Sequence, residues 1–558
     1  MAISPLAGKL ANRSRLATNE QMRRAYYNKS SIPGMIPIKN GTSGHRGVTG
    51  EGFTELHVLA MTQALSDIIT NKGSFGPELS QEMKNILGIK ECSRVDTIVI
   101  GKDVRYASDF AQKTAARIFA ANGYTVMINN NNERSTPTPV ISHRILGENK
   151  KGENVEGVII TASHNPPEEA GYKTNGRDGG PNTNTKPIDE LANYYLRHSD
   201  GIRRIPYEIA LRKGFIITKD LIKPYVEDLK YVIDMKSIRM SGGFAVTPLG
   251  GSANGIYEAI NERYGTNIKV VLPEPDPAGA NRTYDHDGKL RGDPSSVYVM
   301  MAVDKFWNSL KAKGYKAIFA NDNDADRFGA IDSTGILNPN HALCVLFDYL
   351  CADRNFPVSM GIGRTIGTTH MLDLIAKHYG RSSHEVNVGF KWYVKGLLTG
   401  TYVLAGEESA GLSFPRFDGS VWTTEKDGIA ANLLMMEIMA KTGKDIGTLY
   451  GELAQKYGAH KYERVDAPAT DEKKERLAAL IADPGKVESI LNDIKIAGQA
   501  VKSKKIGDGI KVVLEDGTWV LFRASGTENI IKVYKETRGN TLEPANKAAE
   551  ELIRLLNL

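Results

Sequence analysis

Hydrophobic and polar positions divide the chain into two alternating kinds of segment. Short apolar runs, such as 97–100, 244–246 and 317–320, each lead into a loop of polar residues and glycine, and this pattern predicts buried strands. Between these runs, apolar residues recur every three to four positions, as in 54–70, where the spacing predicts an amphipathic helix with Thr54 as its cap. The alternation is typical of α/β domains, whose ligands bind beyond the carboxyl ends of the strands. We therefore expect the chemistry to lie in the polar loops.

The pattern changes at three places, which divide the 558 residues into four expected domains. The first boundary falls near 205, after a charged run, and the second near 315, before the strand that leads into an acidic loop at 322–326. After Gly458, two extended runs flank 524–529 and predict a hairpin. The expected domains are α/β domain I at 1–205, α/β domain II at 206–315, α/β domain III at 316–455 with the acidic loop at the II/III boundary, and a smaller α+β domain IV at 456–558.

Composition narrows the class of protein. The chain has 71 Lys and Arg residues against 65 Asp and Glu residues, and the excess is spread out without a basic block. This argues against a nucleic-acid-binding protein and allows local basic pockets for a small anion. No apolar run approaches the roughly 20 residues of a spanning helix, and the first residues lack the apolar core of a signal peptide. We expect a cytoplasmic protein without a membrane partner, with Cys92, Cys344 and Cys351 as buried free thiols.

The acidic loop is a candidate metal site. Asp322, Asp324 and Asp326 alternate along the loop that follows a predicted strand. A calcium EF-hand is excluded, because its sixth position requires glycine and its twelfth glutamate, whereas this chain has Arg327 and Ser333 there. A solvated acidic turn is the simpler alternative, but three carboxylates so close together would repel one another without a cation. The loop therefore favours a Mg²⁺ site that is completed by phosphate oxygens.

Ser163 is a candidate carrier of a phosphoryl group. It lies in the polar loop 161–166, after the apolar run 158–160. Serine, histidine and asparagine are also ordinary turn residues, so the loop alone is a moderate signal. The surrounding residues are not the Gly-x-Ser-x-Gly elbow of a hydrolase, and His164 is too close in sequence to act as a triad base. A phosphorylatable serine and a metal site together indicate phosphoryl transfer.

Two further loops have the chemistry to hold a substrate, although either could be a plain turn. Glu407 and Ser409 lie in a glycine-bounded turn at 406–411, where a carboxylate and a hydroxyl suit the vicinal hydroxyls of a sugar. The second loop combines a guanidinium, two hydroxyls and freed backbone N–H groups, which suit a phosphate dianion. Its residues are Arg523, Ser525, Gly526 and Thr527.

Three cations are candidates for the same site. Arg46 lies in the glycine-rich loop 41–47, Lys173 follows Ser163 by ten residues, and Lys391 lies beside aromatic residues. Each could be an ordinary surface residue. The neighbouring motifs favour a role in the site.

These motifs resemble the α-D-phosphohexomutase superfamily, and specifically its bacterial phosphoglucomutase branch. They occur in family order over nearly the whole chain. The matching segments are GTSGHRG at 41, GKDVRYAS at 101, TASHNPPEEAGYK at 161, DNDADR at 322, VGFKW at 388, GEESAG at 406, DGSVWTTEKDG at 418 and RASGTE at 523. Ala524 departs from the family pattern, where proline is usual.

The resemblance implies four domains around a central cleft, three of related α/β topology with mixed sheets and a smaller α+β domain at the carboxyl end. It implies that Ser163 is the phosphoserine and that Mg²⁺ is held by Asp322, Asp324, Asp326 and a phosphoryl oxygen on Ser163. By their positions in the matching motifs, three further groups of residues are implied to have the roles of their family counterparts. Arg46, His164, Lys173 and Lys391 would surround the transferring group, Glu407 and Ser409 would grip sugar hydroxyls, and Arg523, Ser525, Gly526 and Thr527 would hold the other phosphate.

The implied activity is the interconversion of α-D-glucose 1-phosphate and glucose 6-phosphate, with Mg²⁺ as cofactor. Glucose 1,6-bisphosphate would be both intermediate and activator, and the protein would be a monomer or homodimer. A phosphomannomutase or another phosphohexomutase is the nearest alternative. A metal-dependent phosphatase and a non-catalytic sugar-phosphate sensor are alternatives of other classes. The sugar grip argues against the phosphatase, and the presence of Ser163 with all three aspartates argues against the sensor.

Overall fold

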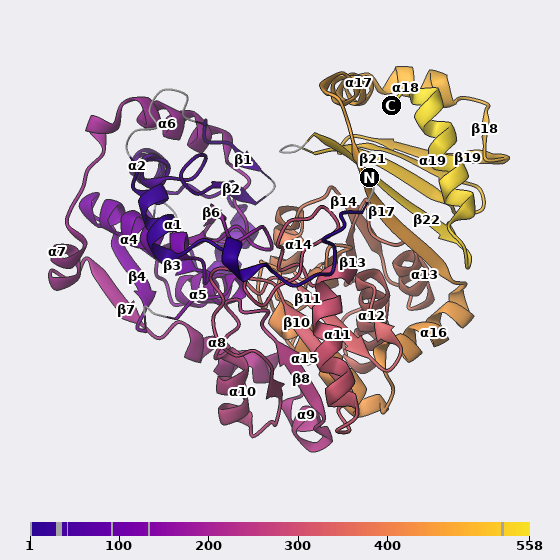
Figure 1. Ribbon diagram of the computed structural model, residues 1–558, viewed down its shortest axis with the longest axis horizontal. Helices are drawn as coiled ribbons and strands as arrows, with labels where there is room; N and C mark the ends of the chain where they lie inside the picture. Colours follow the sequence, from indigo (N-terminus) through magenta and orange to yellow (C-terminus); the bar gives the residue numbers. More distant parts are fainter. Residues whose placement is uncertain (1–2, 29–35, 42, 91–92, 132–133, 526–528) are drawn as a thin grey trace.

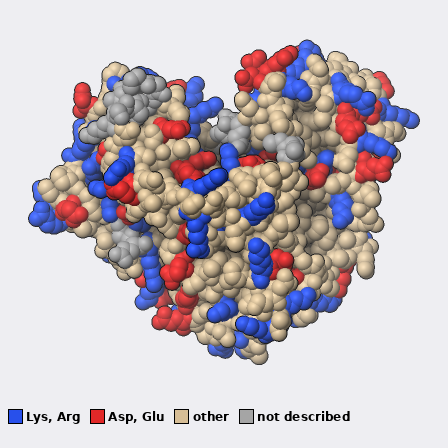
Figure 2. Space-filling model, in the orientation of Figure 1, with Lys and Arg blue, Asp and Glu red and all other residues tan. Residues whose placement is uncertain are grey.

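Four sheets follow one another along the chain, three of them mixed and the last wholly antiparallel. The computed structural model describes residues 3–28, 36–41, 43–90, 93–131, 134–525 and 529–558. Domain I lies at the left of Figure 1, domains II and III in the centre and below, and domain IV at the upper right. The space-filling view has a hollow between the lobes of domains I and IV (Figure 2). The predicted four-domain α/β architecture is confirmed, and the hollow lies where the resemblance implies a cleft.

Domain I is built on a seven-stranded sheet in which parallel strands lie beside an antiparallel edge. In sheet order its strands are β1 (Asn40–Gly41), β2 (Gly44–Val48), β6 (Glu169–Asn175), β5 (Val155–Ile160), β3 (Thr97–Lys102), β4 (Thr125–Asn129) and β7 (Ile216–Lys219). Its helices are α1 (Asn19–Tyr26), α2 (Glu55–Lys72), α3 (Gln81–Leu87), α4 (Tyr106–Ala121), α5 (Thr138–Asn149), α6 (Lys186–Arg197) and α7 (Tyr207–Arg212). Since β7 pairs with β4, the expected boundary near 205 falls before the last strand of the first sheet.

The helix expected at 54–70 is present as α2, but it differs from the expectation in two ways. Thr54 occupies the cap position without capping the backbone, and its hydroxyl instead lies 2.8 Å from Nδ1 of His57. Most residues of α2 are buried, instead of only one stripe of apolar residues, because α4 and α6 both pack against the helix. Contacts from other elements therefore override the amphipathic pattern.

Domain II contains the acidic loop. Its five strands, in sheet order, are β12 (Gly335–Ile336), β11 (Phe328–Asp332), β10 (Ala317–Asn321), β8 (Phe244–Thr247) and β9 (Lys269–Val270). Its helices are α8 (Ile222–Asp228), α9 (Met235–Ser241), α10 (Ile256–Tyr264) and α11 (Val297–Lys311). The loop connects β10 to its antiparallel neighbour β11, and β10 pairs in parallel with β8. The boundary expected near 315 therefore cuts this sheet, because the chain continues pairing with β8 after that point.

Domains III and IV complete the chain. The strands of domain III, in sheet order, are β14 (Ser383–Val386), β13 (Gly361–Thr365), β15 (Tyr402–Glu407) and β16 (Gly411–Ser413), and its helices are α12 (Pro339–Asp353), α13 (Met371–His378), α14 (Val394–Leu398), α15 (Gly428–Thr442) and α16 (Ile446–Tyr457). The strands of domain IV are β17 (His460–Pro468), β22 (Ile530–Arg538), β21 (Trp519–Ala524), β20 (Ile510–Leu514), β19 (Gln499–Ile506) and β18 (Lys495–Ile496), and its helices are α17 (Asp471–Ala482), α18 (Pro484–Leu491) and α19 (Glu543–Leu556). The predicted hairpin is confirmed as β21 and β22.

Two other expectations concern burial and membranes. Cys344 and Cys351 are buried free thiols as expected, and Cys92 lies outside the described residues. No helix in the described part of the chain is both long enough and apolar enough to cross a membrane.

Helix α15 of domain III contacts the end of β10 and the acidic loop of domain II. The side-chain amide of Asn432 donates to the Ala320 carbonyl and to Oδ1 of Asn321, each at 3.2 Å, where β10 ends. At the start of the helix, the Gly428 N–H donates to the carbonyl of Ala325 at 3.1 Å. The loop is therefore fixed by a helix of the next domain.

The close approach at Gly428 gives a test of this packing. A Cβ atom at this position would lie 2.1 Å from the Arg327 carbonyl oxygen. We expect Gly428→Ala to displace the acidic loop and to lower the free energy of unfolding by about 1–3 kcal/mol, seen as a lower midpoint of thermal unfolding.

Gly451→Ala in α16 is the matched control, since nothing lies within 4 Å of a Cβ atom there. Alanine stabilises a helix relative to glycine by about 1 kcal/mol, so this variant is expected to unfold at the same or a higher temperature. An unchanged midpoint in Gly428→Ala would contradict the close contact.

Candidate active site

Ser163 is held in a strained and almost fully buried position after β5. Its φ of 52° lies in the left-handed region, which is uncommon for a residue other than glycine. Its N–H donates to Oγ1 of Thr161 at 2.9 Å, and its carbonyl accepts from Nη2 of Arg105 and Nδ2 of Asn323, both at 2.7 Å. Strain of this kind persists only where surrounding contacts fix the residue, and it is concentrated at functional sites.

The Ser163 hydroxyl is aimed at the acidic loop. It donates to Oδ2 of Asp322 at 2.9 Å, although the two residues are 159 positions apart. The loop itself turns at Ala325, which has a φ of 57° and whose N–H donates to the carbonyl of Asp322 at 3.1 Å. Residues of domains I and II that are distant in sequence are therefore brought into direct contact.

The loop is also tied to α5 of domain I and to two lysines. Thr138, the first residue of α5, donates from its N–H to the Asp324 carbonyl and from its hydroxyl to Oδ2 of Asp324, each at 2.9 Å. Lys173 Nζ lies 2.6 Å from Oδ2 of Asp324 and 3.3 Å from Oδ2 of Asp326, while Lys426 Nζ lies 3.1 Å from the same Asp326 oxygen. Two ammonium groups thus offset part of the negative charge.

Charge is distributed unequally among the three carboxylates. Burial, and then repulsion by Asp324 and Asp326, raises the pKa of Asp322 well above its ordinary value. Burial also acts to raise the pKa of Asp324, but the interactions with Lys173, Asp322 and Lys426 together outweigh burial and the pKa is lowered. Burial acts to lower the pKa of Lys173, yet the two carboxylates that it contacts raise it above its ordinary value. Lys173 is therefore held as a cation.

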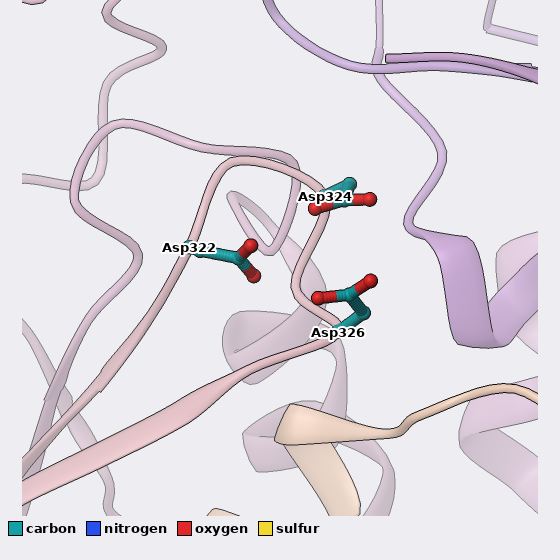
Figure 3. Close-up of side chains that lie close together, drawn as sticks. All are labelled: Asp322, Asp324 and Asp326. Atoms are coloured by element: carbon teal, nitrogen blue, oxygen red, sulfur yellow. The ribbon is translucent and has the colours of Figure 1, made fainter. Parts of the chain in front are cut away.

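The donor set fits a hard divalent cation. Ligand oxygens of Asp322, Asp324 and Asp326 lie within 4.8 Å of one another, and the carboxylates turn toward the same space in Figure 3. Within the described part of the chain, Oδ1 of Asp324 and Oδ1 of Asp326 are buried without a hydrogen-bond partner. Unpaired buried carboxylate oxygens are costly, and carboxylate oxygens are the ligands that Mg²⁺ prefers. The three aspartates are therefore suited to hold Mg²⁺.

His164 and Arg46 lie on the Ser163 side of this cluster. His164 Nδ1 lies 3.4 Å from the Ser163 hydroxyl oxygen. Burial, followed by the Arg327 and Arg46 charges, lowers the pKa of His164 well below its ordinary value, so the ring is neutral at pH 7. Arg46 lies on β2 and donates from Nη1 to Oδ1 of Asn165 at 3.0 Å.

A second group of predicted residues lies in domain III. Glu407 ends β15, and its buried carboxylate accepts the Gly389 N–H at 3.0 Å. Burial raises the pKa of Glu407, and the Lys426 charge acts in the opposite direction. The Ser409 hydroxyl lies 3.5 Å from Oε2 of Glu407, and Lys391 lies in a short helical turn with its ammonium 5.4 Å from the ring centre of Trp392.

The third group lies in domain IV. Arg523 is on β21, where its Nε donates to the backbone carbonyl of Asp508 at 2.9 Å. Ser525 is buried, and its N–H donates to the Ile530 carbonyl at 3.0 Å. Gly526 and Thr527 lie outside the described residues.

The structure thus brings Ser163, His164, Lys173 and Arg46 together around the three aspartates. Glu407 and Ser409 lie together in domain III, and Lys391 lies two residues after Gly389, which binds Glu407. Arg523 and Ser525 lie on a separate domain. Lys426, Arg105, Asn323 and Thr138 are supporting residues that were not among the predicted site residues. Lys426, Arg105 and Asn323 do lie inside the matching segments at 418, 101 and 322, so the motifs held a sequence signal for these three but not for Thr138.

Comparison with known families identifies the same four domains along the chain. Models of the four domains of phosphoglucomutase/phosphomannomutase match residues 37–199 (domain I), 223–335 (domain II), 338–457 (domain III) and 464–554 (C-terminal domain). The chain belongs to this family. The domain II match includes the acidic loop, in agreement with the pairing of β10 and β8.

Relatives of this chain match it over nearly its full length. It is 39% identical to a phosphoglucomutase of Komagataeibacter xylinus, over 96% of this chain and 94% of the relative. It is 26% identical to a phosphoglucomutase/phosphomannomutase of Thermococcus kodakarensis, over 92% of this chain and 98% of the relative. Among solved structures, the open form of parafusin, a phosphoglucomutase from Paramecium, has the same fold, with a TM-score of 0.72, 19% identity and coverage of 94% of this chain and 96% of that one.

The metal assignment can be tested directly. Asp324→Asn removes one negative charge and one ligand oxygen, and we expect it to weaken Mg²⁺ binding by more than about tenfold, measured by isothermal titration calorimetry on unphosphorylated protein. Asp471→Asn, on the exposed first turn of α17, is the control and is expected to bind Mg²⁺ as the wild type does. Equal affinity in wild type and Asp324→Asn would contradict the assignment.

Proposed function

We propose that this protein is a phosphoglucomutase that interconverts α-D-glucose 1-phosphate and glucose 6-phosphate through phosphoserine 163. The observation that carries the proposal is the 2.9 Å hydrogen bond from the Ser163 hydroxyl to Asp322, one of three buried aspartates that fit a divalent cation. The 39% identity to a phosphoglucomutase over nearly the full chain supports the choice of substrate.

In the proposed reaction the bond between Ser163 Oγ and phosphorus breaks as the 6-hydroxyl oxygen of glucose 1-phosphate bonds to phosphorus. The product is glucose 1,6-bisphosphate. Its 1-phosphate then returns to Ser163, and glucose 6-phosphate leaves. The intermediate must reverse its orientation between the two transfers, so one site accepts two poses.

Residues near Ser163 have distinct proposed roles. Mg²⁺, when held by the three aspartates, supplies positive charge that stabilises the transferring phosphoryl group. The Lys173 ammonium and the Arg46 guanidinium add positive charge beside it. The proton of the sugar 6-hydroxyl must reach Ser163 Oγ as the serine–phosphorus bond breaks. His164 is neutral and lies 3.4 Å from Ser163 Oγ, which favours it over Lys173 as the group that carries this proton.

The other predicted residues would hold the sugar and its second phosphate. Glu407 and Ser409 are suited to the sugar hydroxyls, with Lys391 nearby, and Arg523 with Ser525, Gly526 and Thr527 is suited to the phosphate that does not react. Because these groups lie on domains III and IV, closure of domain IV would exclude water, which limits transfer to solvent. The free thiols Cys344 and Cys351 fit a reducing cytoplasm, where we expect the enzyme to act as a monomer or homodimer.

Ser163→Ala tests this reaction. In a coupled assay of glucose 6-phosphate formation with Mg²⁺, we expect the wild type to be activated by glucose 1,6-bisphosphate and Ser163→Ala to lose activity by about a thousandfold or more, because no oxygen remains to carry the phosphoryl group. Ser489→Ala, an exposed serine on α18, is the control and should remain fully active.

The assay also separates the alternatives. Full activity in Ser163→Ala would defeat the proposal, and inorganic phosphate as the main product would identify a phosphatase. Faster turnover of mannose 1-phosphate than of glucose 1-phosphate would make the protein a phosphomannomutase.

A further inference from the structure

Asp508 of domain IV lies where the proposed phosphate grip meets domain III. It is in the short connection between β19 and β20, and its Oδ2 accepts the backbone N–H of Val388 at 2.8 Å. Val388 follows β14 of domain III, three positions before Lys391. A single carboxylate thus joins the two domains at the edge of the substrate site.

The same residue holds one edge of the Arg523 guanidinium. Nε of Arg523 donates to the Asp508 carbonyl at 2.9 Å, and Nη2 donates to Oδ1 of Asp508 at 3.1 Å. The backbone is shaped for this approach, because Gly509 has a φ of 150° and a Cβ atom there would lie 2.7 Å from Cγ of Arg523. A guanidinium held along one edge presents its remaining donors in a fixed direction.

A second hydrogen bond extends the connection to the proposed sugar grip. The next residue after Val388 is Gly389, whose N–H donates to Oε1 of Glu407 at 3.0 Å. Two successive backbone N–H groups therefore bind two carboxylates, one from domain IV and one from domain III. The connection runs from Arg523 through Asp508 and the 388–389 peptide to Glu407.

We infer that Asp508 is a positioning residue that aims Arg523 at the substrate phosphate and sets its distance from the sugar-binding Glu407. The inference rests on the proposed function, in which Arg523 holds the phosphate that does not react. A residue that acts through such a contact affects substrate binding in the ground state and the transition state alike. Its loss should therefore raise KM more than it lowers kcat.

Other contacts hold domain IV to domain III, so loss of Asp508 need not release the domain. Lys511 Nζ donates to the Ile366 carbonyl at 2.6 Å and lies 3.2 Å from Oε2 of Glu385. The His370 N–H donates to Oε1 of Glu536 at 3.0 Å. An effect of Asp508 on substrate binding can therefore be separated from an effect on folding.

The first experiment compares Asp508→Ala, Asp508→Asn and the control Asp516→Asn. Asp516 is exposed and accepts the local N–H of Thr518 in the β20–β21 turn at 2.8 Å. We expect Asp508→Ala to raise KM for glucose 1-phosphate by about tenfold and to change kcat by less than about threefold. Asp508→Asn keeps one acceptor oxygen and should lie between wild type and Asp508→Ala, while Asp516→Asn should match wild type. All should unfold within a few degrees of wild type. An unchanged KM in Asp508→Ala would overturn the inference.

A double-mutant cycle with Arg523→Ala shows whether Asp508 acts through Arg523. In the Arg523→Ala background, Asp508→Ala should change KM by less than about twofold, because the residue that it positions is absent. An equal rise of KM in both backgrounds would overturn the inference. The same cycle measured by calorimetric binding of glucose 1-phosphate needs no turnover, so it tests Asp508 even if the proposed mutase reaction is not found.

Discussion

The close approach of three buried carboxylates is the constraint on which the rest of this structure depends. Asp322, Asp324 and Asp326 offer oxygens within 4.8 Å of one another, and in an interior of low dielectric such charges repel strongly. Lys173 and Lys426 offset part of this repulsion. The remaining buried oxygens fit a divalent cation, and in the proposed reaction that cation would stabilise the transferring phosphoryl group.

Three domains share the task of holding this cluster in place. The acidic loop belongs to the sheet of domain II, helix α5 of domain I binds it through Thr138, and helix α15 of domain III binds it through Asn432 and Gly428. Ser163 reaches the cluster from β5 of domain I. Domain IV is attached separately, through contacts such as Asp508 with Val388. A separate attachment suits the role proposed for this domain, which is to hold either phosphate of a reorienting intermediate.

The sequence alone predicted those parts of the site whose residues lie close together in the chain. Alternating aspartates in one loop and a serine after an apolar run could be recognised without a structure, as could the hairpin around 524–529. The boundary expected near 315 assigned β10 to domain III, whereas β10 pairs with β8 of domain II. These strands are about 70 residues apart, and pairing over such a separation cannot be read from the local sequence. The roles of Lys426 and Thr138 likewise depend on long-range contacts.

Transfer of the phosphoryl group from Ser163 to the sugar tests the account most directly. The protein would be labelled with glucose 1,6-bisphosphate that carries radioactive phosphate and then separated from small molecules. One sample would be digested to map the labelled peptide. A second, intact sample would be mixed with unlabelled glucose 1-phosphate. The account predicts label on the Ser163 peptide, its transfer to sugar phosphate within one turnover when Mg²⁺ is present, and its retention on the protein with a chelator. Label on another residue, or its release as inorganic phosphate, would contradict the account.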